Sequence, residues 1–455
     1  MRREAAIAPA ASVAAREIGD VEQARHVLDR LAFGARPGEI ERVRARGVDR
    51  WIDEQLHPGR VRDPQGERVS EMFPLLRSDP AALLRDVDAA RGAAPGDSAM
   101  RRALRMRYND VGRAVQSARL ARAVGSERQL QEVLVDLWAN HFSVFAGKGP
   151  VRLYLGRYEE DAIRPHVLGK FRDLLGAVAH SPAMLFYLDN WQSAADSLHP
   201  TLARRPMLRR PAGPRAPRGL NENYARELLE LHTLGVDGGY TQHDVIEVAR
   251  ALTGWSIAAP REGGGFVFRP ALHDAGEKIV LGVRIPAGGG ESDGERVLDI
   301  LARHPSTARM VATTLARRFV SDDPPPALVA RAAAVYQRTD GNLREVTRAI
   351  VTSPEFFARD AYRAKIKSPL ELVASALRAT GIPADSTPRA AHAVAQLGQP
   401  IYGRQTPDGW PERSSEWLSA GAVADRVNFI ALITKRAAID DSTRALLESP
   451  DFQRR

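Results

Sequence analysis

The chain has 455 residues, of which 44% are hydrophobic and 27% charged, with a formal net charge of +9 and no cysteine. This length is sufficient to bury a large core, while the lack of cysteine excludes disulfides, thiolate zinc sites, cysteine-held iron–sulfur clusters and a cysteine nucleophile. The positive charge raises the question of nucleic acid, but no zinc-finger spacing, aromatic RNA-binding motif or glycine-rich phosphate loop occurs, so nucleic-acid binding is not expected.

Residues 1–19 are expected to be a flexible N-terminal segment. The segment starts with two arginines and has an Ala-rich patch, but it is weakly hydrophobic and interrupted by Glu4 and Pro9, which is not typical of a signal peptide. We therefore expect a cytoplasmic protein as the chain is written, or an exported one if the start codon is misassigned. No run of about 18 apolar residues occurs, so we expect no membrane span.

Residues 20–440 are expected to form one large, predominantly all-α domain, followed by a C-terminal tail at 441–455. Apolar residues recur at the helical period through most of this region. The clearest helix start is Thr241, with Asp244 three residues later as the second half of a capping box. The arginines are mostly interleaved with acids, which indicates solvated helix faces. The pattern predicts helices at 20–33, 38–47, 48–56, 99–123, 127–142 and 241–255.

A basic insert interrupts the helical pattern at 194–219. Its densest part, RRPMLRRPAGPRAPRG at 204–219, is rich in Arg, Pro and Gly, a composition that does not build a packed core. We expect a mobile loop here. The alternative is a contact site for an anion or nucleic acid.

Residues 256–290 depart from the helical pattern. Glycine clusters surround two short β-like runs, FVF and KIVLGVRI, so we expect a small β-hairpin near 264–285 that projects from the helical body. His273 and Asp274 lie between the runs, in or beside the joining loop. A loop histidine beside an acid can act as a general base or metal ligand, whereas the alternative is an aspartate that makes an Asx-turn.

Two stretches resemble each other. GKFRDLLGAVAHSP at 169–182 and GNLREVTRAIVTSP at 341–354 share Gly, Arg, Ala, Ser and Pro in register. Each reads as a helix followed by Ser-Pro, which is a natural start for the next helix. The match predicts a duplicated helical hairpin, and the alternative is that favourable helix junctions recur by chance.

In NENYARELLELHTLG (221–235) a histidine and two glutamates share one helical stretch, as metal ligands often do. At about 100° per residue His232 falls within the apolar stripe while Glu227 and Glu230 point elsewhere, so one helix cannot chelate an ion with these three. His141 also lies in an apolar stripe, near the end of another helix. Two interpretations remain open: core histidines bonded to backbone carbonyls, or ligands that converge on a pocket between helices.

The turn-rich stretch 397–419 carries Tyr402, Trp410 and Trp417. Aromatic side chains on such a segment can line a ligand groove. They can equally form a lid that seals a helical core, which is the interpretation we prefer because tryptophan usually contributes apolar burial.

Taken together, these stretches resemble a bacterial family catalogued as domain of unknown function 1800, from about residue 20 to 440. The resemblance implies an all-helical outline and no established activity. It also implies gene neighbours from a second uncharacterised family that looks like a relative of phosphatases or sulfatases, and export signals in many members. The segments that carry it are HVLDRLAFGARPGEI (26–40), WANHF (138–142), HSPAMLFYLDN (180–190), NENYARELLELHTLGVDGGYTQHDV (221–245), ARALTGW (249–255), HDAGEKIVLG (273–282), HPSTAR (304–309), SPEFF (353–357), KSPLELV (367–373) and LGQPIYGRQTPDGWP (397–411).

Two hypotheses for function follow. The first is a metal- or histidine-dependent enzyme with a site between helices, in which a divalent metal ion is held by His141 and His232. Its other candidate groups are His273 and Asp274 as base or ligand, Glu227 assisting, and Asn223 and Arg226 orienting an anionic substrate group. The alternative is a non-catalytic partner or maturation factor that holds another, exported protein through the aromatic loop, with the phosphatase/sulfatase-like family as the expected partner.

Overall fold

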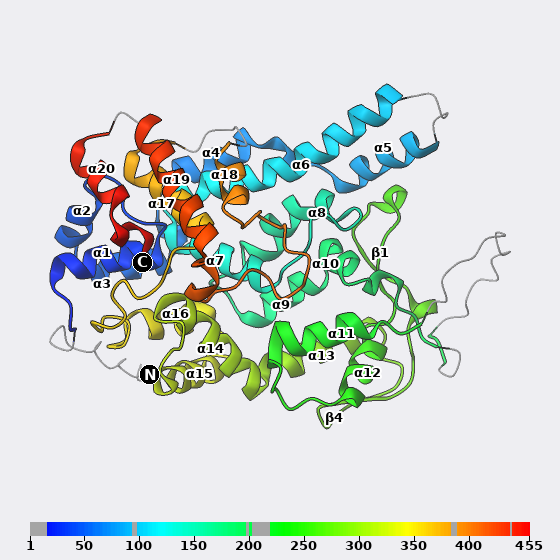
Figure 1. Ribbon diagram of the computed structural model, residues 1–455. Coiled ribbons are helices and arrows are strands. Elements are labelled where there is room, and N and C mark those ends of the chain that lie inside the picture. The colour runs from blue at the N-terminus through cyan, green and yellow to red at the C-terminus, as the bar shows by residue number, and fades with distance from the viewer. Residues whose placement is uncertain (1–15, 93–97, 197–199, 203–218, 384–388, 437–438) are drawn as a thin grey trace.

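The computed structural model describes residues 16–92, 98–196, 200–202, 219–383, 389–436 and 439–455. Most of the predicted flexible segment 1–19 and most of the predicted basic insert 194–219 lie outside these residues. Helices dominate the rest of the chain (Figure 1), which confirms the predominantly all-α class. None of the helices in the described ranges is long and apolar enough to cross a membrane.

Of the first seven helices, α1, α2, α3, α6 and α7 agree with the five predicted for this region, and α4 and α5 were not predicted. The longest of them, α6, pairs with α5 to form an arm that projects from the body of the molecule (Figure 1). Their bounds are α1 Asp20–Leu31, α2 Glu39–Arg46, α3 Val48–Leu56, α4 Pro64–Met72, α5 Pro80–Gly92, α6 Ser98–Gly125 and α7 Gln129–His141.

Local sequence signals explain where later helices begin and end. The predicted capping box is present before α12, where the Thr241 side chain accepts the N–H of Asp244 and the Asp244 carboxylate accepts the N–H of Thr241. The helix α17 starts with a second capping box on Ser368 and ends at Gly381, whose φ of 69° is left-handed. These bounds are α8 Val151–Arg157, α9 Phe171–Ala179, α10 Pro182–Tyr187, α11 Glu222–Leu229, α12 Gln242–Ala251, α13 Glu291–Arg303, α14 Pro305–Phe319, α15 Pro326–Arg338, α16 Leu343–Val351, α17 Pro369–Thr380, α18 Arg389–Gln396, α19 Ala420–Arg436 and α20 Asp441–Glu448.

A small hairpin is confirmed, but the strand pairing differs from the expected one. The strands β1 (Trp255–Ile257) and β2 (Phe266–Phe268) form one antiparallel pair, and β3 (Lys278–Val280) and β4 (Val283–Ile285) form another. The run KIVLGVRI thus folds on itself, because Leu281 and Gly282 both have positive φ and make the two-residue turn that closes a hairpin. FVF pairs with the preceding segment, and His273 lies between the two hairpins.

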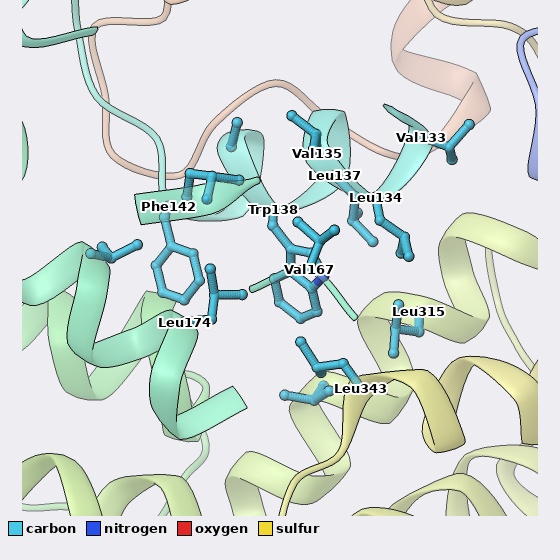
Figure 2. Packing of buried hydrophobic residues seen from close by; sticks show 14 of the residues in the cluster. Val133, Leu134, Val135, Leu137, Trp138, Phe142, Val167, Leu174, Leu315 and Leu343 are labelled. Carbon is cyan, nitrogen blue, oxygen red and sulfur yellow. The ribbon is translucent and has the colours of Figure 1, made fainter. Parts of the chain in front are cut away.

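The helix α7 runs through the centre of the hydrophobic core (Figure 2). Trp138 and Phe142 are fully buried and are surrounded by side chains from several helices, including Leu174 of α9, Leu315 of α14 and Leu343 of α16. A buried side chain of this size contributes about 1.5–3 kcal/mol to folding. Packing around α7 therefore joins segments that are up to two hundred residues apart in the chain.

The predicted C-terminal tail, residues 441–455, packs against the folded body. They form α20 and a short helical turn, and Phe452 is buried. Backbone hydrogen bonds connect Lys365 with Arg455 in both directions, at 3.2 and 2.8 Å, and the N–H of Lys367 donates to the carbonyl of Gln453 at 2.9 Å.

Candidate functional site

The structure brings two of the predicted site residues together. His141 ends α7, and His232 lies in the π-helical turn that follows α11, with 6.5 Å between the ring centroids. The Nε2 of His141 is 3.2 Å from the backbone oxygen of His232. The apolar rings of Trp138 and Phe142 pack against this pair.

The surroundings of the two histidines keep them neutral. Burial lowers the pKa of His141 to about 4 and that of His232 to about 3. The ring of His232 is fully buried, and neither of its nitrogens has a hydrogen-bond partner within the described part of the chain. The core-histidine interpretation fits His141, which contacts a backbone carbonyl, while His232 is held by apolar packing alone.

His273 lies in a different polar cluster. Its Nδ1 is 2.8 Å from the backbone oxygen of Thr253, and its Nε2 is 3.3 Å from the Asp293 carboxylate. Lys278 donates to the same Asp293 carboxylate at 2.8 Å, and the side chains of His273, Lys278 and Asp293 are fully buried. Burial alone would raise the pKa of Asp293, but hydrogen bonds from His273 and Lys278 lower it. The histidine is therefore fixed between hydrogen-bond partners.

The side chain of Asp274 makes an ion pair and a turn. Arg250 donates to its carboxylate at 2.7 and 3.2 Å and also pairs with Glu247 at 2.7 Å. The N–H of Gly276 donates to Asp274 at 2.8 Å, which is the Asx-turn named as the alternative role for this residue. Burial tends to raise the pKa of Asp274, but these donors lower it.

The remaining predicted site residues lie on α11. Asn223 is exposed, and Arg226 donates to Gln242 at 2.8 Å. Glu227 is partly buried, and its burial, together with the negative charge of Glu230, raises its pKa. The hydrogen bonds, ion pairs and ring contacts of these three side chains do not include His141, His232 or His273.

These positions do not combine into a metal centre. Across the residues that the structure describes, no group of three or more His, Asp or Glu side chains is arranged to hold a metal ion. His141 and His232 lie together, whereas His273 and Asp274 each belong to a set of hydrogen-bonded and ion-paired neighbours of their own.

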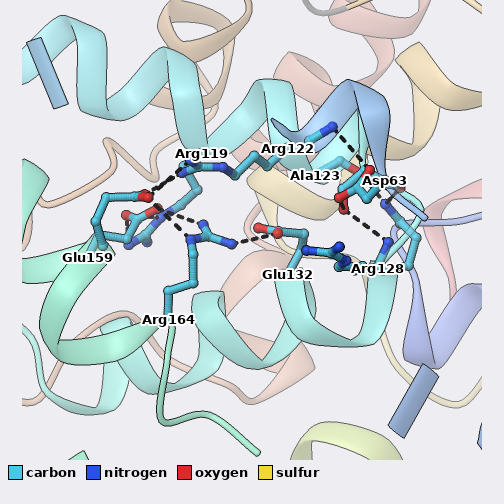
Figure 3. A network of polar contacts seen from close by, with 12 residues as sticks. Asp63, Arg119, Arg122, Ala123, Arg128, Glu132, Glu159 and Arg164 are labelled. Carbon is cyan, nitrogen blue, oxygen red and sulfur yellow. Dashed lines mark hydrogen bonds and ion pairs between the residues drawn. The ribbon is translucent and has the colours of Figure 1, made fainter. Parts of the chain in front are cut away.

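The sequence analysis missed a buried ion-pair network between α6, α7 and the π-helical turn Tyr158–Ile163 (Figure 3). Arg119 donates to Glu159 at 2.6 Å, and Arg164 donates to Glu132 at 2.6 Å. Burial alone would raise the pKa of Glu159, but the two arginines lower it and keep the carboxylate ionised. The expectation that most arginines lie on solvated helix faces does not hold for Arg119, which is buried. Its position in an apolar stretch of α6 is the sequence signal for this burial.

The aromatic loop 397–419 packs inward as a lid. Asn140 of α7 donates to the backbone oxygen of Trp410 and accepts the Trp410 N–H, both at 2.7 Å. The hydroxyl of Tyr402 lies 2.6 Å from Arg119, and the rings of Tyr402 and Trp417 are buried. The lid interpretation therefore fits this loop better than that of an open ligand groove.

A groove between α17, α18 and α19 was not anticipated. Its volume is about 930 Å³, within the range of ligand and peptide sites. Its lining is largely apolar, with a few polar groups such as Arg389, His392 and Asp425. The apolar lining includes Val373, Leu377, Leu397, Phe429, Leu432 and Ile433.

Comparison with known proteins gives a family and no activity. No curated protein and no solved structure matches the chain. Residues 26–454, nearly the whole sequence, match a family described as "Protein of unknown function (DUF1800)". This protein is therefore a member of the DUF1800 family.

Proposed function

We propose that this protein is a non-catalytic binding partner of another protein, which it holds in the groove between α17, α18 and α19. The observation that carries the proposal is the apolar lining of that 930 Å³ groove. Three side chains of α19 add apolar surface to it: Phe429 and Ile433 are partly buried, and Leu432 is 46% exposed.

The helix α19 has more apolar surface than its own domain covers. Its buried side packs through Arg426 and Ile430, while Val423 and Val427 are 43% and 60% exposed. A helix with apolar residues on several sides is normally buried on those sides. A groove flanked by helices fits the apolar face of an amphipathic helix. We therefore take the bound segment to be an amphipathic helix of the partner.

The family resemblance supplies the candidate partner, a protein of the phosphatase/sulfatase-like family. We place the docking site in this groove and not in the aromatic loop 397–419, because that loop already packs against α7. The histidine- or metal-dependent enzyme has less support, because its three candidate histidines are not arranged as one site and His273 and Asp274 are already paired.

The test is a binding measurement with the purified full chain and a purified protein of the phosphatase/sulfatase-like family that the resemblance implies as partner. Leu432→Asp places a charge in the groove, and we expect it to weaken binding at least about tenfold, as for a central interface residue. Val236→Asp is the matched control, because Val236 is 70% exposed and lies outside the groove. Equal affinity for both variants would overturn the groove as the docking site.

A further inference from the structure

A second cavity, of about 380 Å³, contains an unusual lysine. Lys367 immediately precedes the cap of α17, is 4% exposed and lines this cavity. Its Nζ lies 3.9 Å from the centroid of the Phe452 ring. In the described ranges it forms no ion pair with a carboxylate.

Four of the five other lysines form ion pairs with aspartates, and the fifth, Lys435, is exposed. Lys148 and Lys170 pair with aspartates at 2.6 Å, and Lys278 pairs at 2.8 Å. Lys365, two residues from Lys367 and equally buried, pairs with an aspartate at 2.5 Å. A buried ammonium without a directly paired carboxylate has only part of its lost hydration offset, here by the Phe452 ring, so the neutral amine is favoured relative to an exposed lysine.

Burial outweighs the charges around Lys367 in setting its pKa. Burial lowers the pKa of Lys367, Asp29 and Glu371 oppose this effect, and Arg455 and Arg25 add to it, which gives a pKa of about 8. The side chain is therefore the free amine far more often near neutral pH than an exposed lysine, whose ordinary pKa is about 10.4. A free amine is a nucleophile, whereas an ammonium is not.

The cavity also contains groups that can hold an anion and handle a proton. Arg25 and Arg454 line it, and neither forms an ion pair with a carboxylate of the described residues. Asp29 lines it as well, and burial raises the pKa of this carboxyl. Guanidinium groups bind carboxylate and phosphate readily, and a carboxyl group can exchange a proton with a reacting amine or carbonyl.

We propose that Lys367 is a covalent binding site for a small aldehyde or ketone that carries a carboxylate or phosphate. The Lys367 amine attacks the carbonyl carbon and forms a C–N bond, and a proton moves from nitrogen to oxygen to give a carbinolamine. The C–O bond then breaks, water leaves with a proton from Asp29, and the imine nitrogen returns one proton. The net change is amine plus carbonyl to imine plus water, so no oxidant or reductant is needed. Arg25 and Arg454 hold the anionic group.

The experiment uses the full chain with glyoxylate, an aldehyde that carries a carboxylate, and cyanoborohydride to reduce any imine to a stable amine. Peptide mapping by mass spectrometry then locates the adduct. We expect saturable labelling of Lys367 and little labelling of Lys365, the ion-paired neighbour. Lys367→Arg, which keeps the positive charge over Phe452, should abolish that label, while Lys365→Arg should retain it. Labelling confined to exposed Lys435 and the N-terminus at saturating glyoxylate would overturn the proposal.

A second measurement tests the anion site separately. Arg25→Gln should raise the glyoxylate concentration for half-maximal labelling of Lys367 several-fold and leave labelling by uncharged propionaldehyde unchanged. If wild type labels Lys367 at the same concentration of either aldehyde, the amine is reactive but the anion recognition is wrong. This inference concerns a cavity distinct from the α17–α19 groove, so partner binding and labelling succeed or fail independently.

Discussion

Phe171 and Leu343, the first residues of α9 and α16, are joined through a reciprocal pair of backbone hydrogen bonds. The N–H of Phe171 donates to the carbonyl of Gly341, and the N–H of Leu343 donates to that of Gly169, each at 2.8 Å. The two stretches that resemble each other in sequence therefore meet in space at equivalent positions. Such an arrangement is what a duplicated helical hairpin packed on its own copy would give, and it supports the duplication hypothesis.

This contact depends on the left-handed backbone of Gly341. Its φ is 73°, and an added Cβ would lie 3.2 Å from the Tyr336 ring. We expect Gly341→Ala to lower the free energy of unfolding by about 1–2 kcal/mol, since alanine is strained at positive φ. The matched control is Gly421→Ala in α19, where an added Cβ meets nothing within 4 Å and alanine favours the helix. Urea unfolding that gives both variants the same change would contradict this account.

The lid depends on the side chain of Asn140. Because it both donates to and accepts from the Trp410 backbone, Asn140→Ala leaves two polar groups without partners, at a cost of about 2 kcal/mol. We expect lower stability and faster proteolytic cleavage within 397–419. Asn223→Ala is the control, because that asparagine is exposed on α11. Cleavage at an unchanged rate would show that Asn140 does not hold the lid.

Much of the fold could be predicted from local sequence, because helix period and caps are local properties. Thr241 and Asp244 specify the start of α12 within four residues, and the structure confirms it. The strand pairing could not be obtained in this way, because FVF has only three residues and can pair on either side. Its choice of the 255–257 segment depends on tertiary packing.

The site-level predictions were limited for the same reason. The apolar stripes predict that His141 and His232 each face inward, and the structure has His232 fully buried and His141 partly buried, but periodicity does not show that the two rings lie together or what surrounds them. The surroundings of Lys367 come from Asp29 and Phe452, which are far from it in the sequence, so no local pattern around 367 could indicate its cavity. Long-range contacts decide whether a buried polar residue is paired or free.

The neutral histidine pair predicts a defined loss of stability in acid. The pKa values of His141 and His232 are lowered to about 4 and about 3, below the unfolded value of about 6.5. The two neutral histidines therefore contribute fully to the free energy of unfolding above pH 6.5. This contribution is lost as the pH falls toward 4, because the unfolded chain binds the protons first. The expected slope is about 1.4 kcal/mol per pH unit for each histidine.

The double variant His141→Gln/His232→Leu provides the comparison for that slope. Neither substitute titrates, so the free energy of unfolding should depend less steeply on pH between 6.5 and 5. Buried carboxylates such as Glu371, with a pKa lowered to about 2 by Arg318 and Arg455 against the effect of burial, contribute mainly at lower pH. Equal slopes for wild type and variant over this interval would show that the histidines titrate normally in the folded protein.

The ion-pair network of Figure 3 predicts an asymmetry between breaking a buried pair and removing it. Arg119→Met leaves the Glu159 carboxylate buried with less compensation, and we expect a loss of about 3–5 kcal/mol in urea unfolding. Arg113→Met on the same helix is the control, because its side chain is 61% exposed and such surface pairs contribute little. The double variant Arg119→Met/Glu159→Gln should recover part of the loss, because no uncompensated charge remains. If the free-energy losses of the single variants Arg119→Met and Glu159→Gln simply add up in the double variant, the pair is not coupled. The stability at this position then comes from the packing of the Arg119 side chain.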